Sequence, residues 1–465
     1  MSTRKSFVMG ALLLALPNIV QNLITNLAAL VDNLMVGGLQ EHAIAGVTIV
    51  NQVVFIITIV MFGIGGTAGI FIPQYKGIGD EKKMTEVFKI SLVLSLIFGV
   101  VFFLIMNVIP EVILTFFATD ADTISEALSY LRFIQYTLLI LPISFAIGSA
   151  FRFCGHVKIP MYLAMVTVGV STFLNIGLIH GNFGMPAMGV QGAALGTLVA
   201  RVIELVIFVV LTRHVATPVK IHFRRFFKLE GVLFKSFLQK GYGLILNEFF
   251  WVFGMQVLTV IYTMRISENI AAMSIASTFS KLIWVGMGGM SVVFSLYLGE
   301  HLGRNDFDAA RRDARRLKLF SAGLGLTLAS FVFVASLFLM ELYHVAPEVM
   351  RTGRLLLLVS VSFSWLYYLN SSYYFILRSG GDTKGVLLID SAFTWFIMIP
   401  AAFVIGRFGL FIPMHFFLVQ LLEMVKGMVA HGLYRKGNWL NNLTIGEEVA
   451  AGGDDVDEVV NQVVC

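Results

Sequence analysis

Short polar or Pro/Gly-rich breaks divide this sequence into twelve long apolar segments, and no other feature restricts its possible folds as strongly. Most of the segments exceed the length of about 18 residues that marks a membrane-spanning helix. In lipid, every backbone polar group must be paired within the chain, so segments of this length are predicted to be helices. The predicted spans are 8–36, 43–72, 86–109, 127–150, 160–180, 189–212, 241–264, 270–299, 317–340, 353–377, 385–405 and 410–434.

The composition agrees with this interpretation. Charged residues make up 13% of the 465 residues and hydrophobic residues 57%, with a mean hydropathy of +0.85. Soluble domains carry about 25% charged residues, so this chain has too few polar side chains to cover a water-facing surface. The sequence therefore predicts an all-α, multi-pass protein of the cell membrane.

The distribution of basic residues predicts the orientation of the chain. Most of the 33 Lys and Arg residues fall in alternate connections, in groups such as those at 76–89, 213–240 and 304–318. Short cytoplasmic loops collect Lys and Arg, so both termini are predicted to be cytoplasmic. The opposite side receives only Arg265, Arg351, Arg354 and Arg407.

The two halves of the chain resemble each other at an offset of 226 residues. The matching positions are Gly77 and Asp80 with Gly303 and Asp306; Arg152, Gly155 and Lys158 with Arg378, Gly381 and Lys384; and Gln21-Asn22 with Asn247-Glu248. Parallel repeats of six helices predict two lobes that rock against each other around a substrate path. We expect an amino lobe at 1–222 (helices 1–6) and a carboxy lobe at 223–440 (helices 7–12). Residues 441–465 are Gly/Asp/Glu-rich, which favours a disordered cytoplasmic tail.

Polar residues recur on one face of the first predicted helix. They are Asn18, Asn22, Thr25, Asn26, Asp32 and Asn33, at helical spacings. A carboxylate at membrane depth is costly and must face protein or a wet cavity, where Asp32 would bind and release a proton or another cation. On the second helix, Asn51 and Gln52 would complete a substrate path with Asn22 and Asn26. The alternative is that these groups only join helices through hydrogen bonds.

The carboxy half contains its own acids at membrane depth. Glu248 lies well inside the seventh predicted helix, beside Asn247 and one turn before Trp251, and Asp390 lies early in the eleventh. We expect Glu248 and Asp390 to couple cations, with Trp251 and two tyrosines of the tenth helix along the substrate path. These tyrosines are Tyr367 and Tyr374.

Other charged residues in the spans have simpler interpretations. Arg201 and Glu204, three residues apart, are expected to pair with each other. Lys281 would neutralise Glu248 or Asp390, or extend toward an interface. Glu423 and Lys426 are also three residues apart, near the end of the last helix. None of these residues is expected in direct contact with a transported cation.

Pro17 interrupts the backbone hydrogen bonds of the first helix fifteen residues before Asp32. Proline bends helices, so Pro17 is either a conformational hinge or a static kink. Motifs for nucleotide binding, metal-dependent proteolysis or a serine nucleophile are missing from the sequence. The chain is therefore predicted not to be an enzyme and to use no cofactor, so that an ion gradient would drive any transport.

Four motifs resemble the multidrug and toxic compound extrusion (MATE) transporters, of the bacterial DinF- and NorM-like branches. The resemblance covers residues 8–436, and its motifs are Val31-Asp32-Asn33-Leu34-Met35-Val36-Gly37, Gln191-Gly192-Ala193-Ala194-Leu195-Gly196-Thr197, Asn247-Glu248-Phe249-Phe250-Trp251 and Leu377-Arg378-Ser379-Gly380-Gly381-Asp382-Thr383-Lys384.

This resemblance implies twelve helices in two lobes and export of cationic amphiphilic compounds in exchange for protons or sodium ions. It also implies that Asp32 and Asn175 bind a cation in the amino lobe, that Glu248 is the acid of the carboxy lobe, and that Pro17 is the site of a helix bend. Na⁺ at Asp32 or Glu248 is the only metal expected. A second amino-lobe acid found in one branch corresponds to Ile179 here, so the coupling ion and its lobe stay open.

Other functions stay open as well. A flippase for a lipid-linked or other amphiphilic metabolite would have the same helices. The resemblance to such flippases implies a cavity lined by cationic residues, whereas the acids Asp32, Glu248 and Asp390 suit cationic substrates. A channel or a membrane-embedded enzyme is a more distant alternative. The expected partners are organic cations and membrane lipids, and no nucleic acid is expected to bind. The protein is expected to be monomeric.

Overall fold

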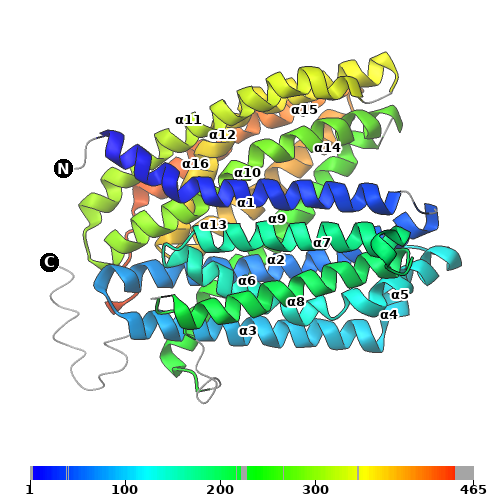
Figure 1. Cartoon of the computed structure of the whole chain (residues 1–465). Helices are drawn as coiled ribbons and strands as arrows, with labels where there is room; N and C mark the ends of the chain where they lie inside the picture. The colour runs from blue at the N-terminus through cyan, green and yellow to red at the C-terminus, as the bar shows by residue number, and fades with distance from the viewer. Residues whose placement is uncertain are drawn as a thin grey trace. The chain divides into compact units, whose positions relative to one another are not determined.

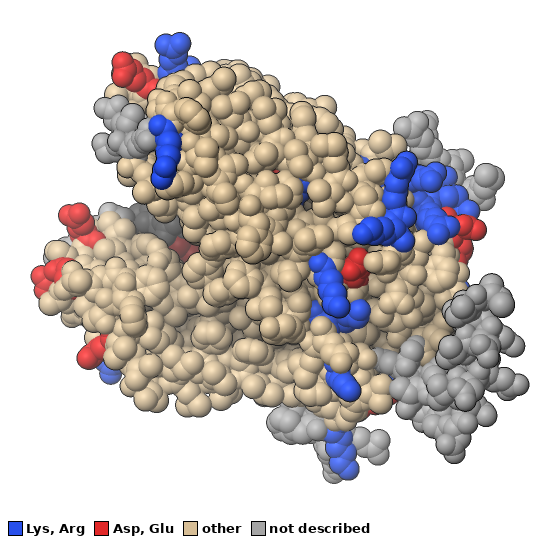
Figure 2. All heavy atoms as spheres, turned by 180° about the vertical axis from the view of Figure 1, so that it is seen from behind, with Lys and Arg blue, Asp and Glu red and all other residues tan. Residues whose placement is uncertain are grey.

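The computed structural model describes residues 4–37, 39, 41–215, 217–220, 228–264, 267–342 and 345–445, and these residues form helices, turns and short connections. Eleven of the described helices are long and apolar enough to cross a membrane, and twelve spans result if one bent pair counts as a single span. The prediction of an all-α membrane fold is therefore confirmed. On the face drawn in Figure 2, most of the surface is uncharged, as contact with lipid requires.

The predicted fourth span, 127–150, is a bent pair rather than one straight helix. Helices α5 (Ala121–Ile134) and α6 (Thr137–Phe153) meet at an angle of 52°. Pro142, near the start of α6, cannot donate a backbone hydrogen bond to the carbonyl of Leu138. The loss of this bond weakens the helix close to the bend.

The chain divides into two compact units. Unit 1 comprises Met1–Ile19, Gly69–Gly79 and Leu238–Cys465, and unit 2 comprises Val20–Ala68 and Asp80–Phe237. The first two long helices contribute to both units, and the expected division at residue 222 stays a prediction. These helices are α1 (Arg4–Gly37) and α2 (Glu41–Ile78).

Unit 2 contains the remaining helices of the amino-terminal half. They are α3 (Glu81–Val108), α4 (Pro110–Thr115), α5, α6, α7 (Lys158–His180), the 3₁₀ turn η1 (Asn182–Gly184) and α8 (Val190–His214). Aspartate side chains cap free N–H groups at helix starts in this unit, as Asp80 does for α3 by accepting from the N–H of Lys83 at 3.0 Å.

Helices α7 and α8 pack side by side because α8 has glycines four residues apart (Figure 1). A Cβ atom at Gly192 would lie 2.3 Å from the carbonyl oxygen of Leu178, and one at Gly196 would lie 2.3 Å from Oδ1 of Asn175. Small residues at this spacing let two membrane helices approach closely. The approach fixes the position of Asn175 on α7.

Unit 1 contains the carboxy-terminal helices. They are α9 (Gly231–Thr263), which begins in unit 2, α10 (Ser267–Gly303), α11 (Phe307–Leu339), the 3₁₀ turn η3 (Met340–Leu342), α12 (Pro347–Ser379), α13 (Thr383–Leu387), the π-helical turns η4 (Leu388–Ala392) and η5 (Thr394–Met398), α14 (Ile399–Gly406), α15 (Ile412–Gln420) and α16 (Leu422–Lys436).

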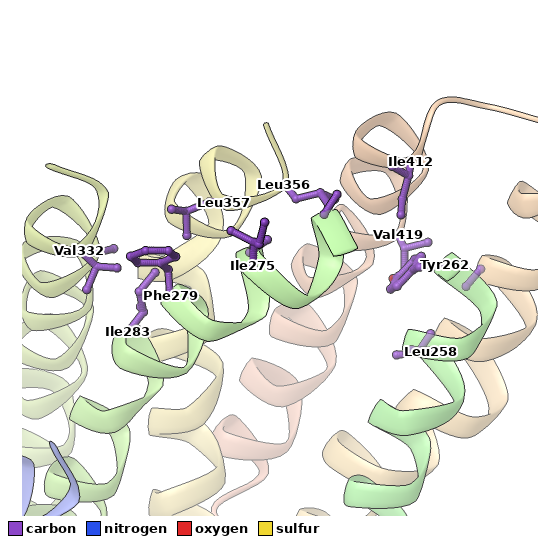
Figure 3. Close-up of a cluster of buried hydrophobic side chains, with 14 of the residues drawn as sticks. Leu258, Tyr262, Ile275, Phe279, Ile283, Val332, Leu356, Leu357, Ile412 and Val419 are labelled. Carbon is purple, nitrogen blue, oxygen red and sulfur yellow. The ribbon is translucent and has the colours of Figure 1, made fainter. Parts of the chain in front are cut away.

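A cluster of buried hydrophobic side chains joins these helices (Figure 3). Leu258 and Tyr262 come from α9, Phe279 from α10, and Val332 from α11, and α12, η5, α14 and α15 contribute others such as Leu357. Each fully buried large apolar side chain contributes about 1.5–3 kcal/mol in water, but lipid is as apolar as the cluster, so here the gain comes from close packing.

The chain after α16 folds back onto unit 1. The N–H of Leu443 donates to Oε1 of Gln74 at 2.8 Å, and Nε2 of Gln74 donates to the carbonyl of Ser379 at 3.0 Å. Trp439 is fully buried against the backbone of Gly380. Residues 441–445 of the expected disordered tail therefore have defined contacts, which the composition alone could not indicate. Residues 446–465 of that tail lie outside the described residues.

Candidate functional site

Unit 2 places Asp32 of α1 against Asn175 of α7. The side-chain amide Nδ2 of Asn175 donates a hydrogen bond of 2.9 Å to Oδ1 of Asp32. Asn175 is 2% exposed, and Asp32 is half-buried. Two side chains separated by 143 residues therefore meet, as the resemblance implied for these two positions.

The amide oxygen of Asn175 has an unused capacity to accept a hydrogen bond. Its Oδ1 atom is buried beside Gly196 and has no hydrogen-bond partner among the described residues. A buried acceptor without a partner is costly, and such exceptions often mark a functional site. Carboxylate and amide oxygens are ligands that hard cations prefer, so the Asp32 carboxylate and this oxygen together have the chemistry to bind a small cation.

The charges nearby are balanced except at Asp32. Nη1 of Arg201 on α8 lies 2.8 Å from Oε2 of Glu204, which confirms the pairing expected from their spacing. Arg201 also interacts electrostatically with Asp32, without a hydrogen bond to it. Ile179 is 3% exposed, so the position of a second acid in related sequences is apolar and dry here.

Among the side chains that the structure describes, no other polar residue of α1 or α2 is hydrogen-bonded to Asp32. Nδ2 of Asn26 donates to the carbonyl of Asn22 at 2.8 Å, within α1. Asn26, Asn51 and Gln52 are exposed, and Asn22 is partly exposed. Exposed amides at membrane depth need water or a polar ligand, but the substrate path stays a prediction. The side chain of Asn33 lies outside the described residues.

Unit 1 holds a second carboxylate and amide pair, reinforced by a lysine. Nδ2 of Asn247 on α9 donates to Oδ2 of Asp390 at 3.1 Å, and Nζ of Lys426 on α16 lies 3.1 Å from Oδ1 of Asp390. Ser391 donates to Oδ1 of Asn247 at 2.8 Å. Both carboxylate oxygens of Asp390 therefore have protein donors.

Lys426 is the partner of Asp390 that sequence reasoning missed. The expected neutralising cation, Lys281, has an exposed side chain. Glu423, the expected neighbour of Lys426, accepts a hydrogen bond of 2.8 Å from Nδ2 of Asn370. Spacing reveals partners on one helix only, and the pair of Lys426 with Asp390 joins two helices.

Glu248 lies near this pair in different surroundings. Its Oε1 atom accepts a hydrogen bond of 2.8 Å from the hydroxyl of Tyr374 on α12. Arg378 interacts electrostatically with Glu248, but its guanidinium donates to the hydroxyl of Ser291 at 2.7 Å. The structure thus brings Glu248 and Tyr374 together, so that Glu248 has a neutral hydrogen-bond partner rather than a lysine.

The aromatic residues expected on the substrate path lie on two helices of unit 1, Trp251 on α9 and Tyr367 and Tyr374 on α12. The ring of Trp251 lies 6.4 Å from that of Trp284 on α10. Tyr367 is partly buried on α12, and no hydrogen bond joins it to Glu248 or Asp390. Their place on a path for substrate stays a prediction.

Pro17 is buried inside α1, and the helix continues through it without interruption. The boundary between the two compact units falls between Ile19 and Val20, two residues after this proline. The missing backbone hydrogen bond therefore lies next to the point where α1 leaves unit 1. This location agrees with a hinge, which stays a prediction.

Comparison with known proteins gives a consistent result. A model of the MatE family matches residues 17–176 and 244–404. The chain is 23% identical to the probable multidrug resistance protein YoeA of Bacillus subtilis (strain 168) over 403 residues, which cover 85% of this chain and 86% of the relative. It is also 23% identical to the probable multidrug resistance protein NorM of Thermotoga maritima over 429 residues, covering 91% and 89%.

The fold is similar to that of solved structures. One is the outward-facing conformation of a multidrug resistance MATE family transporter of the MOP superfamily, with a TM-score of 0.83 and 18% identity. The match covers 94% of this chain and 96% of the solved chain. At this identity, the comparison establishes the fold.

Proposed function

The chain belongs to the MatE family of multi-pass membrane transporters, and from this premise we propose that it exports amphiphilic organic cations in exchange for protons or sodium ions. Members of this family are transporters and not enzymes. The names of the two curated relatives, both multidrug resistance proteins, support the proposed class of substrate.

The observation that carries this proposal is the pair formed by Asp32 and Asn175. Its carboxylate accepts one hydrogen bond at 2.9 Å, and the neighbouring amide oxygen has no donor. A proton or Na⁺ on Asp32 would neutralise the carboxylate, and Na⁺ would also bind the free amide oxygen. We propose Asp32 and Asn175 as the coupling site, with Glu248 as a second acid.

Exchange requires that the coupling ion and the substrate compete. A charged carboxylate attracts an organic cation, and the same carboxylate no longer does so when a proton or Na⁺ has neutralised it. Each ligand then favours the conformation that it binds more tightly. We propose that bending of α1 at Pro17 links the state of Asp32 to that conformational change.

A flippase for lipid-linked anionic substrates is the second candidate within transporters. An anionic pyrophosphate is attracted by Lys and Arg side chains, whereas Asp32 and Glu248 place a half-buried acid at membrane depth in each unit. Neither of these carboxylates forms an ion pair among the described residues. The charges therefore favour cations.

Transport in proteoliposomes tests the proposal. Purified protein would be reconstituted, and efflux of ethidium would be followed under an imposed proton gradient and, separately, an imposed sodium gradient. We expect one of the gradients to drive efflux by the wild type and Asp32→Asn to abolish it. The exposed residue Glu111 provides a matched control, since Glu111→Gln removes a carboxylate and leaves Asp32 and Glu248 unchanged. Absence of cation flux under both gradients would contradict the proposal.

A further inference from the structure

The most unusual charge in unit 1 is the ammonium group of Lys426. Its side chain is 12% exposed and that of Asp390 is 18% exposed, and they meet at 3.1 Å. Asn247 occupies the other carboxylate oxygen. A transported cation that approached Asp390 would therefore meet a carboxylate already neutralised by the protein.

Glu248 differs in this respect. It receives a neutral phenol hydrogen bond from Tyr374, and the nearest guanidinium, that of Arg378, donates to Ser291 instead. Glu248 and Asp390 lie close enough to interact electrostatically. Among the described residues, a lysine ammonium group is bonded to Asp390 but not to Glu248. The charge that remains for a mobile cation is that of Glu248.

The other charges around Lys426 do not change this assignment. Glu423 lies one turn earlier on α16 and interacts electrostatically with the ammonium group, but its Oε2 atom accepts from Asn370. The carboxylate in contact with Lys426 is that of Asp390. The ammonium group is thus directed to another helix.

The backbone around Asp390 is also irregular. π-helical turns cover Leu388–Ala392 and Thr394–Met398, on both sides of Phe393. The hydroxyl of Thr394 donates to the carbonyl of Asp390 at 2.7 Å. Such turns are rare and frequent at functional sites. Asp390 lies within the first of these turns.

We propose that Lys426 is a tethered cation that occupies Asp390 and leaves Glu248 as the single carboxylate for a transported cation in unit 1, so that the protein selects monocations over dications. The inference rests on the proposed function, because it assumes that organic cations are the substrates. A dication needs two negative partners once it leaves water, since an unpaired buried charge is costly. Lys426 removes the second partner.

Binding of two probes to the purified protein tests this inference. Equilibrium dialysis would give the Kd of tetraphenylphosphonium, a monocation, and of methyl viologen, a dication, for the wild type and for Lys426→Gln. The substitution frees Asp390, so we expect methyl viologen to bind at least about tenfold more tightly, while tetraphenylphosphonium changes less. Lys426→Arg, which keeps the charge, and the double variant Lys426→Gln/Asp390→Asn should both retain the wild-type preference.

Other results would overturn the inference. Unchanged methyl viologen affinity in a monodisperse Lys426→Gln protein would show that Lys426 serves packing alone. If that variant does not fold, the double variant Lys426→Gln/Asp390→Asn decides, because it removes both charges of the pair: it should leave tetraphenylphosphonium binding within about twofold of the wild type, and a loss as large as that of Glu248→Gln would contradict the inference. A wild type that binds neither probe would instead contradict the proposed function.

Discussion

The side-chain amide of Asn247 donates a hydrogen bond to Asp390 across 143 residues of the chain, the same separation that joins Asp32 to Asn175. Both bonds link the first predicted helix of a half to the fifth. The acid lies on the first helix in the amino-terminal half and on the fifth helix in the carboxy-terminal half. At the repeat offset, Asn247 corresponds to Gln21, eleven residues before Asp32. At 1.5 Å per residue, the two pairs therefore differ by about 16 Å in position along the helix.

The two pairs also differ in their charged neighbours. The pair in unit 2 keeps a free amide oxygen beside an acid without a lysine, whereas the acid of the pair in unit 1 is held by Lys426. We therefore expect Asn175→Leu to lower coupled transport at least about tenfold, because a donor to a charged group is worth about 1.5–3 kcal/mol. Initial efflux rates in proteoliposomes check this. Asn182→Leu, at an exposed position of the turn η1 after α7, is the control, and equal rates for both variants would argue against a role for Asn175.

The close packing of α7 and α8 makes a prediction for stability. A methyl group at Gly196 would overlap the amide oxygen of Asn175, at 2.3 Å, whereas nothing lies within 4 Å of one at Gly169 on α7. Gly196→Ala should therefore destabilise the protein by roughly 1–3 kcal/mol and impair transport. Gly169→Ala should be neutral or slightly stabilising. Thermal unfolding in detergent compares the two, and a Tm of Gly196→Ala equal to that of Gly169→Ala would contradict the packing described here.

The contacts of Gln74 predict a structural role for the segment after α16. Gln74→Leu removes a donor to the carbonyl of Ser379 and an acceptor for the N–H of Leu443. Each buried group left unpaired costs about 1–3 kcal/mol, so we expect a clearly lower Tm. Gln135→Leu removes an exposed amide that bonds to the carbonyl of Arg132 and should have little effect. Limited proteolysis provides a second check, since cleavage near residue 440 should accelerate only in Gln74→Leu.

Asp120, outside the spans, predicts a pH dependence. Hydrogen bonds from the hydroxyl and N–H of Thr123, at 2.7 and 2.9 Å, lower the pKa of Asp120 from its ordinary value of 3.8, and His42 adds to this effect. A lowered pKa in the folded state stabilises the protein above pH 3.8 and ceases to do so as the pH falls through the folded value. Asp120→Asn keeps a helix cap but loses the charge. Its Tm should be lower than that of the wild type at pH 6, with the difference shrinking toward pH 3, and a constant difference would contradict this origin.

Much of the fold follows from the sequence because a helix in lipid must satisfy its own backbone. The apolar segments therefore coincide with the candidate spans of the described residues, but the bend between α5 and α6 was missed. The spacing of Arg201 and Glu204 predicted their ion pair, since both lie on one helix.

Contacts between helices could not be predicted in the same way. Asp32 and Glu248 were identified because a carboxylate at membrane depth is rare, and their partners Asn175 and Tyr374 depend on how two helices pack. Asn175 entered only through the family resemblance. Lys426 was overlooked because its partner is 36 residues away on another helix.

The ion that leaves the protein when substrate binds tests the central claim most directly. Tetraphenylphosphonium would be added to purified protein in weakly buffered solution, and released protons and sodium ions would be measured with ion-selective electrodes. We expect the wild type to release one of these ions in proportion to the bound substrate, and Asp32→Asn to release none. Substrate binding to the wild type without release of either ion would contradict exchange at Asp32.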